Sequence, residues 1–201
     1  MKLVLASKNK KKLEEMQAIL EELGVQVCSE ADAGVDVEVE ETGATFAENS
    51  QLKASAVMKA AGLPAVADDS GLCVDALNGA PGVYSARYGG PELDDAGRCR
   101  LLLENMRGLG PRTARFVSAI TCCLPNGDVI TACGECRGTI AFAPQGTDGF
   151  GYDPLFWIPQ EKKTFAQMTP EEKNAISHRG RALADFVQKL KAYLSAHPEL
   201  C

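Results

Sequence analysis

The sequence has few of the residues on which several common kinds of active site depend. It contains only two histidines, and His197 lies close to the end of the chain, so a nucleophilic triad would have to use His178. The G-x-S-x-G elbow and the G-x-x-x-x-G-K-[ST] phosphate loop are missing, and no Rossmann fingerprint follows the first apolar segment. These absences argue against a serine hydrolase, a P-loop nucleotidase and a dinucleotide-binding enzyme.

Long apolar runs and an excess of positive charge are also missing. No run approaches the ~20 residues of a membrane-spanning helix, and the short apolar stretch before the first lysines does not suffice for a secretory signal. The net charge is −6, from 21 basic and 27 acidic residues, which disfavours generic binding of nucleic acid. The sequence therefore predicts a cytoplasmic protein with neither a membrane nor a nucleic acid as its partner.

Eight cysteines are present, but their spacing favours no metal or disulfide framework. Cys133 and Cys136 form one C-x-x-C pair without a second pair or a nearby histidine, whereas a structural zinc needs four ligands. Disulfides are also disfavoured in a cytosolic chain. A thiol-regulated protein that uses Cys133 and Cys136 stays open as an alternative, and activity with and without reductant would test it.

The pattern of apolar residues predicts one α/β domain over residues 1–201, built around a mixed sheet. The predicted helices cover 11–24, 45–62, 92–108 and 169–194, and the predicted strands cover 2–6, 63–67, 114–125 and 128–141. A turn-rich loop within 146–159 is predicted to lead into a further strand. Thr45 with Glu48, and Thr169 with Glu172, have the spacing of capping boxes at helix starts. Asn126-Gly127 between two strand-like runs predicts a β-hairpin that could form a lobe.

The predicted strand 63–67 runs into two adjacent carboxylates, Asp68 and Asp69. Successive side chains of a strand point to opposite faces, so the pair cannot decorate one exposed side. Either one aspartate caps a turn, or at least one holds something positive.

Cations and an aromatic segment supply possible partners for these acids. Ser7 or Asn9 is placed to cap a lysine-rich helix start, which is a natural anion site. Acids at Glu40-Glu41 and Asp68-Asp69, with lysines elsewhere, suit Mg²⁺ and a polyphosphate. "FGYD" at 150–153 suits a nucleobase. The residues alone therefore favour a nucleotide hydrolase.

The sequence resembles the inosine triphosphate pyrophosphatase family, and within it the bacterial dITP/XTP pyrophosphatases. The resemblance is carried by "ASKNKKK", "EETGATFAENSQLKA", "ADDSGLCVDALNGAPGVYSARY", "GFGYDPLF" and "EEKNAISHRGRAL", in family order from residue 6 to residue 183. It implies a single elongated mixed sheet flanked by helices with a nucleotide cleft. It also implies a homodimer and Mg²⁺-dependent hydrolysis of ITP, dITP and XTP to the monophosphate and pyrophosphate, which cleanses the nucleotide pool.

The resemblance also implies roles for individual residues. Asp69 corresponds to the general base and a Mg²⁺ ligand, Lys12 to a catalytic phosphate contact, and Glu41, with Glu40 as the alternative, to a second metal ligand. The substrate-binding positions are Ser7, Lys8, Asn9, Lys10, Lys11, Lys12, Lys53, Ser70, Phe150, Gly151, Tyr152, Asp153, Lys173, His178 and Arg179. In this interpretation Asp69 faces the attacking water, and Asp68 points elsewhere and braces the loop.

Two expectations follow for the base-binding positions. Arg179 or His178 would donate to the 6-oxo group of hypoxanthine or xanthine, which adenine lacks, whereas guanine must be rejected near its position 2. At ~100° per residue, Lys173, His178 and Arg179 would point to three sides of one helix. If all three contact one nucleotide, the helix must break near Ser177, with Ser177 as a new N-cap.

Two further alternatives come from different directions. A Maf-type pyrophosphatase also begins with "LAS" and a basic loop, but "FGYD" and "SHRG" would then be unexplained. A non-catalytic nucleotide sensor would gain nothing from the set formed by Glu41, Asp69 and the lysines. Mg²⁺-dependent turnover would separate a sensor from an enzyme.

Overall fold

One mixed sheet provides the framework of the α/β fold, as the sequence predicts. The computed structural model describes residues 1–21 and 23–200, and for residues 10, 11, 15 and 200 it describes the backbone alone. The sheet has seven strands in the order β2-β1-β3-β4-β5-β6-β7. β1 (Lys2–Leu5) is parallel to β2 (Gln26–Ser29) and to β3 (Ala65–Val74). β6 (Phe156–Ile158) is antiparallel to β5 (Val129–Ile140) and to β7 (Lys163–Thr164).

The chain divides into two compact units. The first comprises residues 1–69, 118–133 and 182–201, and the second comprises residues 70–117 and 134–181. Three strands, β3, β4 (Thr113–Cys123) and β5, and one helix, α5 (His178–Ala196), contribute residues to both units. That residues 1–201 act as a single domain stays a prediction.

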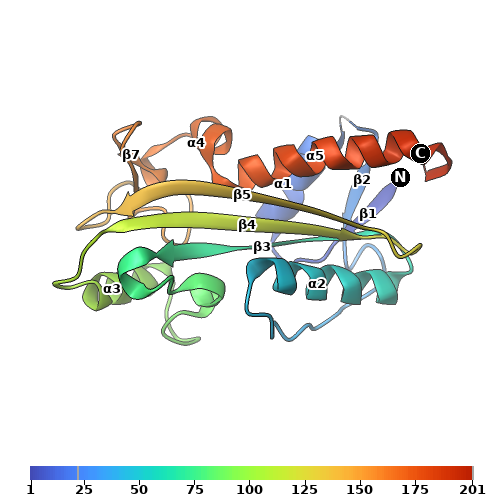
Figure 1. Cartoon of the computed structure of the whole chain (residues 1–201). Helices are drawn as coiled ribbons and strands as arrows, with labels where there is room; N and C mark the ends of the chain where they lie inside the picture. Colours follow the sequence, from blue (N-terminus) through green and yellow to red (C-terminus); the bar gives the residue numbers. More distant parts are fainter. Residues whose placement is uncertain (22, 201) are drawn as a thin grey trace. The chain divides into compact units, whose positions relative to one another are not determined.

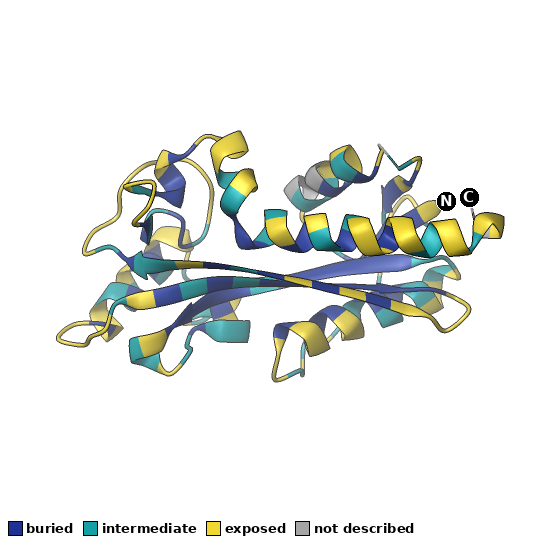
Figure 2. Cartoon of the chain, turned by 45° about the horizontal axis from the view of Figure 1, so that its top comes forward, coloured by how far each residue is buried: buried dark blue, intermediate teal, exposed yellow. Residues whose placement is uncertain are grey.

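The first unit packs helices on both faces of its strands (Figure 1). On one face, α1 (Lys10–Glu21) and α5 cover a core formed by Leu3, Leu5, Met16, Leu20, Phe186 and Leu190. On the other face, α2 (Phe46–Ala61) covers a core formed by Val4, Ala6, Ala54 and Val57. Buried and exposed residues alternate around α5, as expected for a helix with one apolar side (Figure 2).

The second unit has a separate aromatic core. It contains two 3₁₀ helices, η1 (Asp75–Leu77) and η2 (Gly82–Arg87), the helix α3 (Asp95–Asn105), a third 3₁₀ helix, η3 (Phe165–Gln167), and α4 (Pro170–Ile176). The ring centroid of Phe156 lies 4.7 Å from that of Phe116 and 4.9 Å from that of Phe165. Such edge-on and tilted pairs stabilise a core beyond their buried area. A last 3₁₀ turn, η4 (Pro198–Leu200), follows α5 in the first unit.

Local signals predicted several element ends correctly. Thr45 with Glu48 and Thr169 with Glu172 form the expected capping boxes. The hairpin turn at Asn126 lies between β4 and β5, as predicted. The expected break also occurs, because α4 ends at Ile176 and the Ser177 hydroxyl accepts a hydrogen bond from the Gly180 amide at 3.1 Å.

One predicted boundary was wrong and one strand was missed. The strand that was expected to end at Ala67 continues to Val74, so Asp68 and Asp69 lie inside β3 and neither caps a turn. The contacts that hold them come from residues distant in sequence, which a local pattern does not reveal. The short strand β2 after α1 was also missed. None of the helices in the described chain is long and apolar enough to cross a membrane.

The cap of α4 is open to a direct stability test. The Thr169 hydroxyl accepts a hydrogen bond from the Glu172 amide at 3.2 Å, and Glu172 Oε2 accepts one from the Thr169 amide at 2.9 Å. Thr169→Ala should lower the free energy of unfolding by about 1 kcal/mol in urea titrations, because the Glu172 amide at the helix start loses its partner. Thr169→Ser keeps the hydroxyl and should stay near wild type. Equal stability of the alanine variant would contradict this role.

Candidate active site

The two aspartates of β3 lie on opposite faces of the sheet within the first unit. Val66 packs into the core under α1 and α5, whereas Ala65 and Ala67 pack into the core under α2. Because side chains alternate along a strand, Asp68 shares the face of Val66, and Asp69 shares the face of Ala67. Both carboxylates are buried, at 3% and 9% exposure, so each needs partners from its own face.

Asp68 is held by a lysine of α1 and by a neighbouring strand. Its Oδ1 accepts a hydrogen bond of 2.7 Å from the hydroxyl of Ser118, which is fully buried on β4. Its Oδ2 lies 3.0 Å from the Lys12 ammonium, which also donates to the Asp68 main-chain oxygen at 3.1 Å. Asp68 therefore anchors Lys12 and points away from Asp69, as expected, whereas its bracing of the following loop stays a prediction.

Asp69 is held from the other face, by Lys53 of α2. The Lys53 ammonium lies 2.8 Å from Asp69 Oδ1 and 2.9 Å from Glu41 Oε1, so it bridges two carboxylates. Burial raises the pKa of Asp69, an effect that the Lys53 ammonium opposes, and the two carboxylates raise the pKa of Lys53. A carboxylate with a raised pKa is a better proton acceptor than an ordinary one.

One oxygen of the Asp69 carboxylate is available to a ligand. Asp69 Oδ2 is buried and has no hydrogen-bond partner among the described residues. Such an atom is costly unless something else satisfies it, and a hard cation does so well. No cluster of three or more acidic, histidine or cysteine ligands occurs in the described part of the chain. Two carboxylates nevertheless suit Mg²⁺, which keeps waters and takes further oxygens from substrate phosphates.

The acidic segment before α2 discriminates between the two candidate glutamates. Glu41 is partly buried and contacts Lys53, whereas Glu40 is exposed. The structure therefore brings Glu41 to Asp69 through a shared lysine.

The loop between β1 and α1 has the predicted capping geometry. The Ser7 hydroxyl accepts a hydrogen bond from the Asn9 amide at 3.2 Å, and Asn9 Oδ1 accepts one from the Lys12 amide at 3.4 Å. Lys8 is exposed and pairs with Asp36 at 2.9 Å. The side chains of Lys10 and Lys11, also predicted to bind substrate, lie outside the described residues.

In the second unit, the "FGYD" segment is anchored at its acid and leaves its aromatic ring open. Asp153 Oδ2 accepts hydrogen bonds from the Phe150 amide at 2.9 Å and from the Lys173 ammonium at 2.6 Å. The Phe150 ring is 42% exposed. Lys173 Nζ lies 5.0 Å from its centroid and the Arg179 guanidinium carbon lies 5.7 Å from it. An exposed ring beside two cations is a suitable platform for a flat, electron-rich ligand.

Three further predicted residues lie in the same unit. The Tyr152 hydroxyl donates to the Ser85 carbonyl at 2.8 Å, and burial raises the pKa of Tyr152. Tyr152 is thus a core residue that fixes the segment, not an exposed contact. Arg179 donates to the Ser70 hydroxyl at 3.3 Å, which links two predicted contacts directly.

The corner between α4 and α5 positions His178 and Arg179. The His178 ring stacks on Phe116, with centroids 4.7 Å apart and planes 12° apart. A Cβ on Gly180 would lie 1.9 Å from the Asn174 carbonyl oxygen, so only glycine permits this tight corner. The break that the sequence predicted therefore depends on Gly180 as well as on the Ser177 cap.

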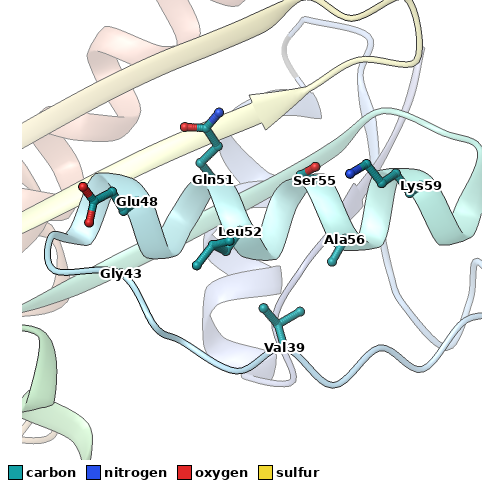
Figure 3. A pocket seen from close by; sticks show the side chains of 8 residues that line it. All are labelled: Val39, Gly43, Glu48, Gln51, Leu52, Ser55, Ala56 and Lys59. Atoms are coloured by element: carbon teal, nitrogen blue, oxygen red, sulfur yellow. The ribbon is translucent and has the colours of Figure 1, made fainter.

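One hollow of the first unit does not contain these residues. It lies along α2 and is lined by Val39, Gly43, Glu48, Gln51, Leu52, Ser55, Ala56 and Lys59 (Figure 3). A second hollow, in the other unit, is lined by residues near Arg112 and Phe142. Neither hollow includes a predicted site residue.

Comparison with known proteins decides the family. A model described as the Ham1 family matches residues 3–189. The chain belongs to the Ham1 family.

Individual members of the Ham1 family are similar over almost the whole chain. A protein of Synechocystis sp. named dITP/XTP pyrophosphatase is 48% identical over 93% of this chain and 94% of its own. A HAM1 protein structure from Coxiella burnetii has a TM-score of 0.89 at 42% identity, and covers 98% of this chain and 99% of that one. A dITP/XTP pyrophosphatase structure from Mycobacterium abscessus has a TM-score of 0.79 at 48% identity, and covers 92% and 96%.

These matches confirm the resemblance drawn from the motifs, and favour it over the Maf-type alternative.

The geometry of β5 disfavours a disulfide switch between Cys133 and Cys136. Cys133 is exposed and Cys136 is buried on the same strand. Three residues of extended strand separate their Cα atoms by about 10 Å, beyond the ~7 Å that a disulfide spans.

Sequence reasoning missed residues that support the candidate site residues within each unit. Ser118 and Phe116 lie on β4, and Asp95 lies at the start of α3. Only Ser118 carries a signal, because a small polar residue inside the apolar run "FVSAIT" suggests a buried hydrogen bond.

The raised pKa of Asp69 predicts how its contribution to stability changes with pH. The folded state holds this proton more tightly than the unfolded state, so the contribution is full below the unfolded pKa of about 3.9 and is lost as pH rises through the folded pKa. In metal chelator, the unfolding free energy of wild type minus that of Asp69→Asn should therefore fall as pH rises from about 4. A difference that grows with pH would show that pairing with Lys53 outweighs burial.

The tight corner predicts that Gly180→Ala is strongly destabilising. The added methyl group must displace the Asn174 carbonyl, and such overpacking costs about 1–3 kcal/mol, despite the better helix propensity of alanine. Thermal and urea unfolding would measure this loss. Ala184→Gly, at an exposed position of α5, provides the opposite exchange and should cost about 1 kcal/mol through propensity alone. A Gly180→Ala protein more stable than wild type would contradict the expected clash with the Asn174 carbonyl.

Proposed function

We propose that this chain hydrolyses ITP, dITP and XTP, which are deaminated purine nucleoside triphosphates, to the monophosphate and pyrophosphate. The observation that carries the proposal is the buried Asp69, with Oδ1 held by Lys53 and Oδ2 without a hydrogen-bond partner among the described residues. A catalytic carboxylate needs this combination of fixed orientation and one available oxygen. Relatives that carry the name dITP/XTP pyrophosphatase support the same reaction.

Asp69 acts as the base in this reaction. Its Oδ2 accepts a proton from the water whose oxygen attacks the α-phosphorus. The bond from the α-phosphorus to the bridging oxygen breaks, and pyrophosphate leaves with the electron pair. Burial raises the pKa of Asp69, which favours proton uptake.

The lysines of the first unit bind the phosphates. Lys12 uses two of its three N–H donors on Asp68, which leaves one for a phosphate oxygen. Lys53 keeps Glu41 and Asp69 close together despite their like charge. Asn9, Ser7, Lys8, Lys10 and Lys11 belong to the loop at the start of α1, where free amides favour anions.

Glu41 and Asp69 would hold the metal, for which we propose Mg²⁺. When bound, it supplies Lewis-acid stabilisation of the phosphate charge.

Residues of the second unit select the base. The exposed Phe150 ring stacks against the purine, while Lys173 and Asp153 fix the segment that carries it. Arg179 and His178 donate to the 6-oxo group, and Ser70 orients Arg179. Adenine presents an amino donor at this position, which leaves the donors unpaired and is strongly penalised.

The finer assignments concern the assembly and its location. We propose a homodimer that acts on the nucleotide pool in the cytoplasm. Light scattering coupled to size exclusion would measure the mass in solution, and a monomer at micromolar concentration would contradict the dimer.

Steady-state hydrolysis of ITP, XTP, dITP, GTP and ATP with Mg²⁺ tests the function. ITP, dITP and XTP should exceed ATP by about 10²-fold or more in kcat/KM, because a mismatched buried donor is costly. They should also exceed GTP, which shares the 6-oxo group and must be rejected near its position 2. In ¹⁸O-water the label should enter the monophosphate. Asp69→Asn, which keeps size and removes the base, should lose turnover by about 10²–10⁴-fold while staying folded.

The other outcomes of this experiment are equally informative. Label in pyrophosphate would place the attack at the wrong phosphorus. Tight nucleotide binding without turnover would favour the sensor alternative.

A further inference from the structure

Two side chains of α3 form hydrogen bonds with the backbone of the "FGYD" segment. Asp95 Oδ2 accepts a hydrogen bond from the Gly151 amide at 2.7 Å. Cys99, one turn later on the same helix, donates its thiol to the Gly151 carbonyl, with sulfur and oxygen 3.4 Å apart. Both polar groups of one residue are thus held by a single helix. The contact from Asp95 involves a charged acceptor, which makes it the stronger of the two.

Both hydrogen bonds involve Gly151, whose backbone conformation is unusual. Gly151 has φ +60°, in the left-handed region that favours glycine. It lies directly after Phe150, so its peptide orientation sets the direction in which the Phe150 ring leaves the chain. The neighbouring residues are fixed elsewhere, Tyr152 by the Ser85 carbonyl and Asp153 by Lys173. The side chains that hold Gly151 in these contacts both come from α3.

The two groups of α3 are themselves well placed for this task. Asp95 also pairs with Arg98 at 3.2 Å, which limits its rotamers. Cys99 is 3% exposed, and burial raises the pKa of its thiol to about 11, so it keeps the proton it donates at neutral pH. Asp94, the adjacent acid, has a different role, because its side chain caps the helix by accepting from the Gly97 amide at 2.7 Å.

We propose that Asp95 is a positioning residue for purine recognition: through Gly151 it orients the Phe150 ring, with Cys99 as the second contact. The inference rests on the proposed function, because it assumes that Phe150 stacks on the purine base. Loss of the contact should weaken binding of ground state and transition state alike, which raises KM and leaves kcat nearly unchanged.

Steady-state kinetics with ITP on wild type, Asp95→Ala, Asp95→Asn and Asp94→Ala test this role. Asp95→Ala should raise KM about tenfold, with kcat within about twofold of wild type. Asp95→Asn keeps an acceptor oxygen for the Gly151 amide and should restore most of the affinity. Asp94→Ala removes the cap of the same helix, so it should lower the melting temperature without raising KM.

A ligand without a base separates positioning from general damage. Inorganic pyrophosphate should inhibit Asp95→Ala and wild type with the same constant, because it uses only the phosphate-binding lysines. Cys99→Ala should raise KM by about two- to threefold, and Cys99→Ser, which keeps a donor, by less. The Cys99 variants also test the contact between α3 and Gly151 if Asp95→Ala does not fold.

Several results would overturn the inference. An unchanged KM in Asp95→Ala would do so, as would an equal rise in Asp94→Ala or an equal loss of pyrophosphate inhibition. An Asp95→Asn variant as impaired as Asp95→Ala would also contradict it. If wild type fails to hydrolyse ITP at all, the proposed function fails, whereas an active wild type with an unaffected Asp95→Ala overturns this inference alone.

Discussion

Strand β3 carries two adjacent carboxylates through the interior of the sheet, and each has to be neutralised from a different face. Lys12 of α1 reaches Asp68, and Lys53 of α2 reaches Asp69. Burying both charges without these lysines would cost several kcal/mol each, so the two helices are tied to the strand by electrostatics as well as by packing. The arrangement also divides the labour. Asp68 is occupied by Ser118 and Lys12, whereas Asp69 Oδ2 has no hydrogen-bond partner in the part of the chain that the structure describes.

The second unit solves a different problem, which is to present flat and cationic groups rigidly. Phe116 supports the His178 ring by stacking, and the corner at Gly180 lies in the first turn of α5, beside His178 and Arg179. Asp153 fixes Lys173, and α3 fixes Gly151. Residues that would not contact a ligand thus fix the positions of residues that would, as is general for preorganised sites.

Much of this could be predicted from the sequence where the cause is local. The capping boxes at Thr45 and Thr169 are set by residues three positions apart. The break at Ser177 follows from helical periodicity once Lys173, His178 and Arg179 are taken to contact one nucleotide. The seven-strand order and the partner of Lys12 could not be predicted in this way. The first depends on non-local pairing, and the second on how α1 is rotated against the sheet. The motif "DDSG" reads as a turn, yet it continues as a strand because distant lysines compensate its charge.

We propose different tasks for the neighbouring aspartates, metal binding for Asp69 and the holding of Lys12 for Asp68. Calorimetric titration with Mg²⁺, in the presence of a nucleoside monophosphate product, would test it most directly on Asp68→Asn and Asp69→Asn. We expect Asp69→Asn to lose metal binding, whereas Asp68→Asn, if folded, should bind Mg²⁺ nearly as wild type does. Loss of binding in Asp68→Asn with retention in Asp69→Asn would contradict it.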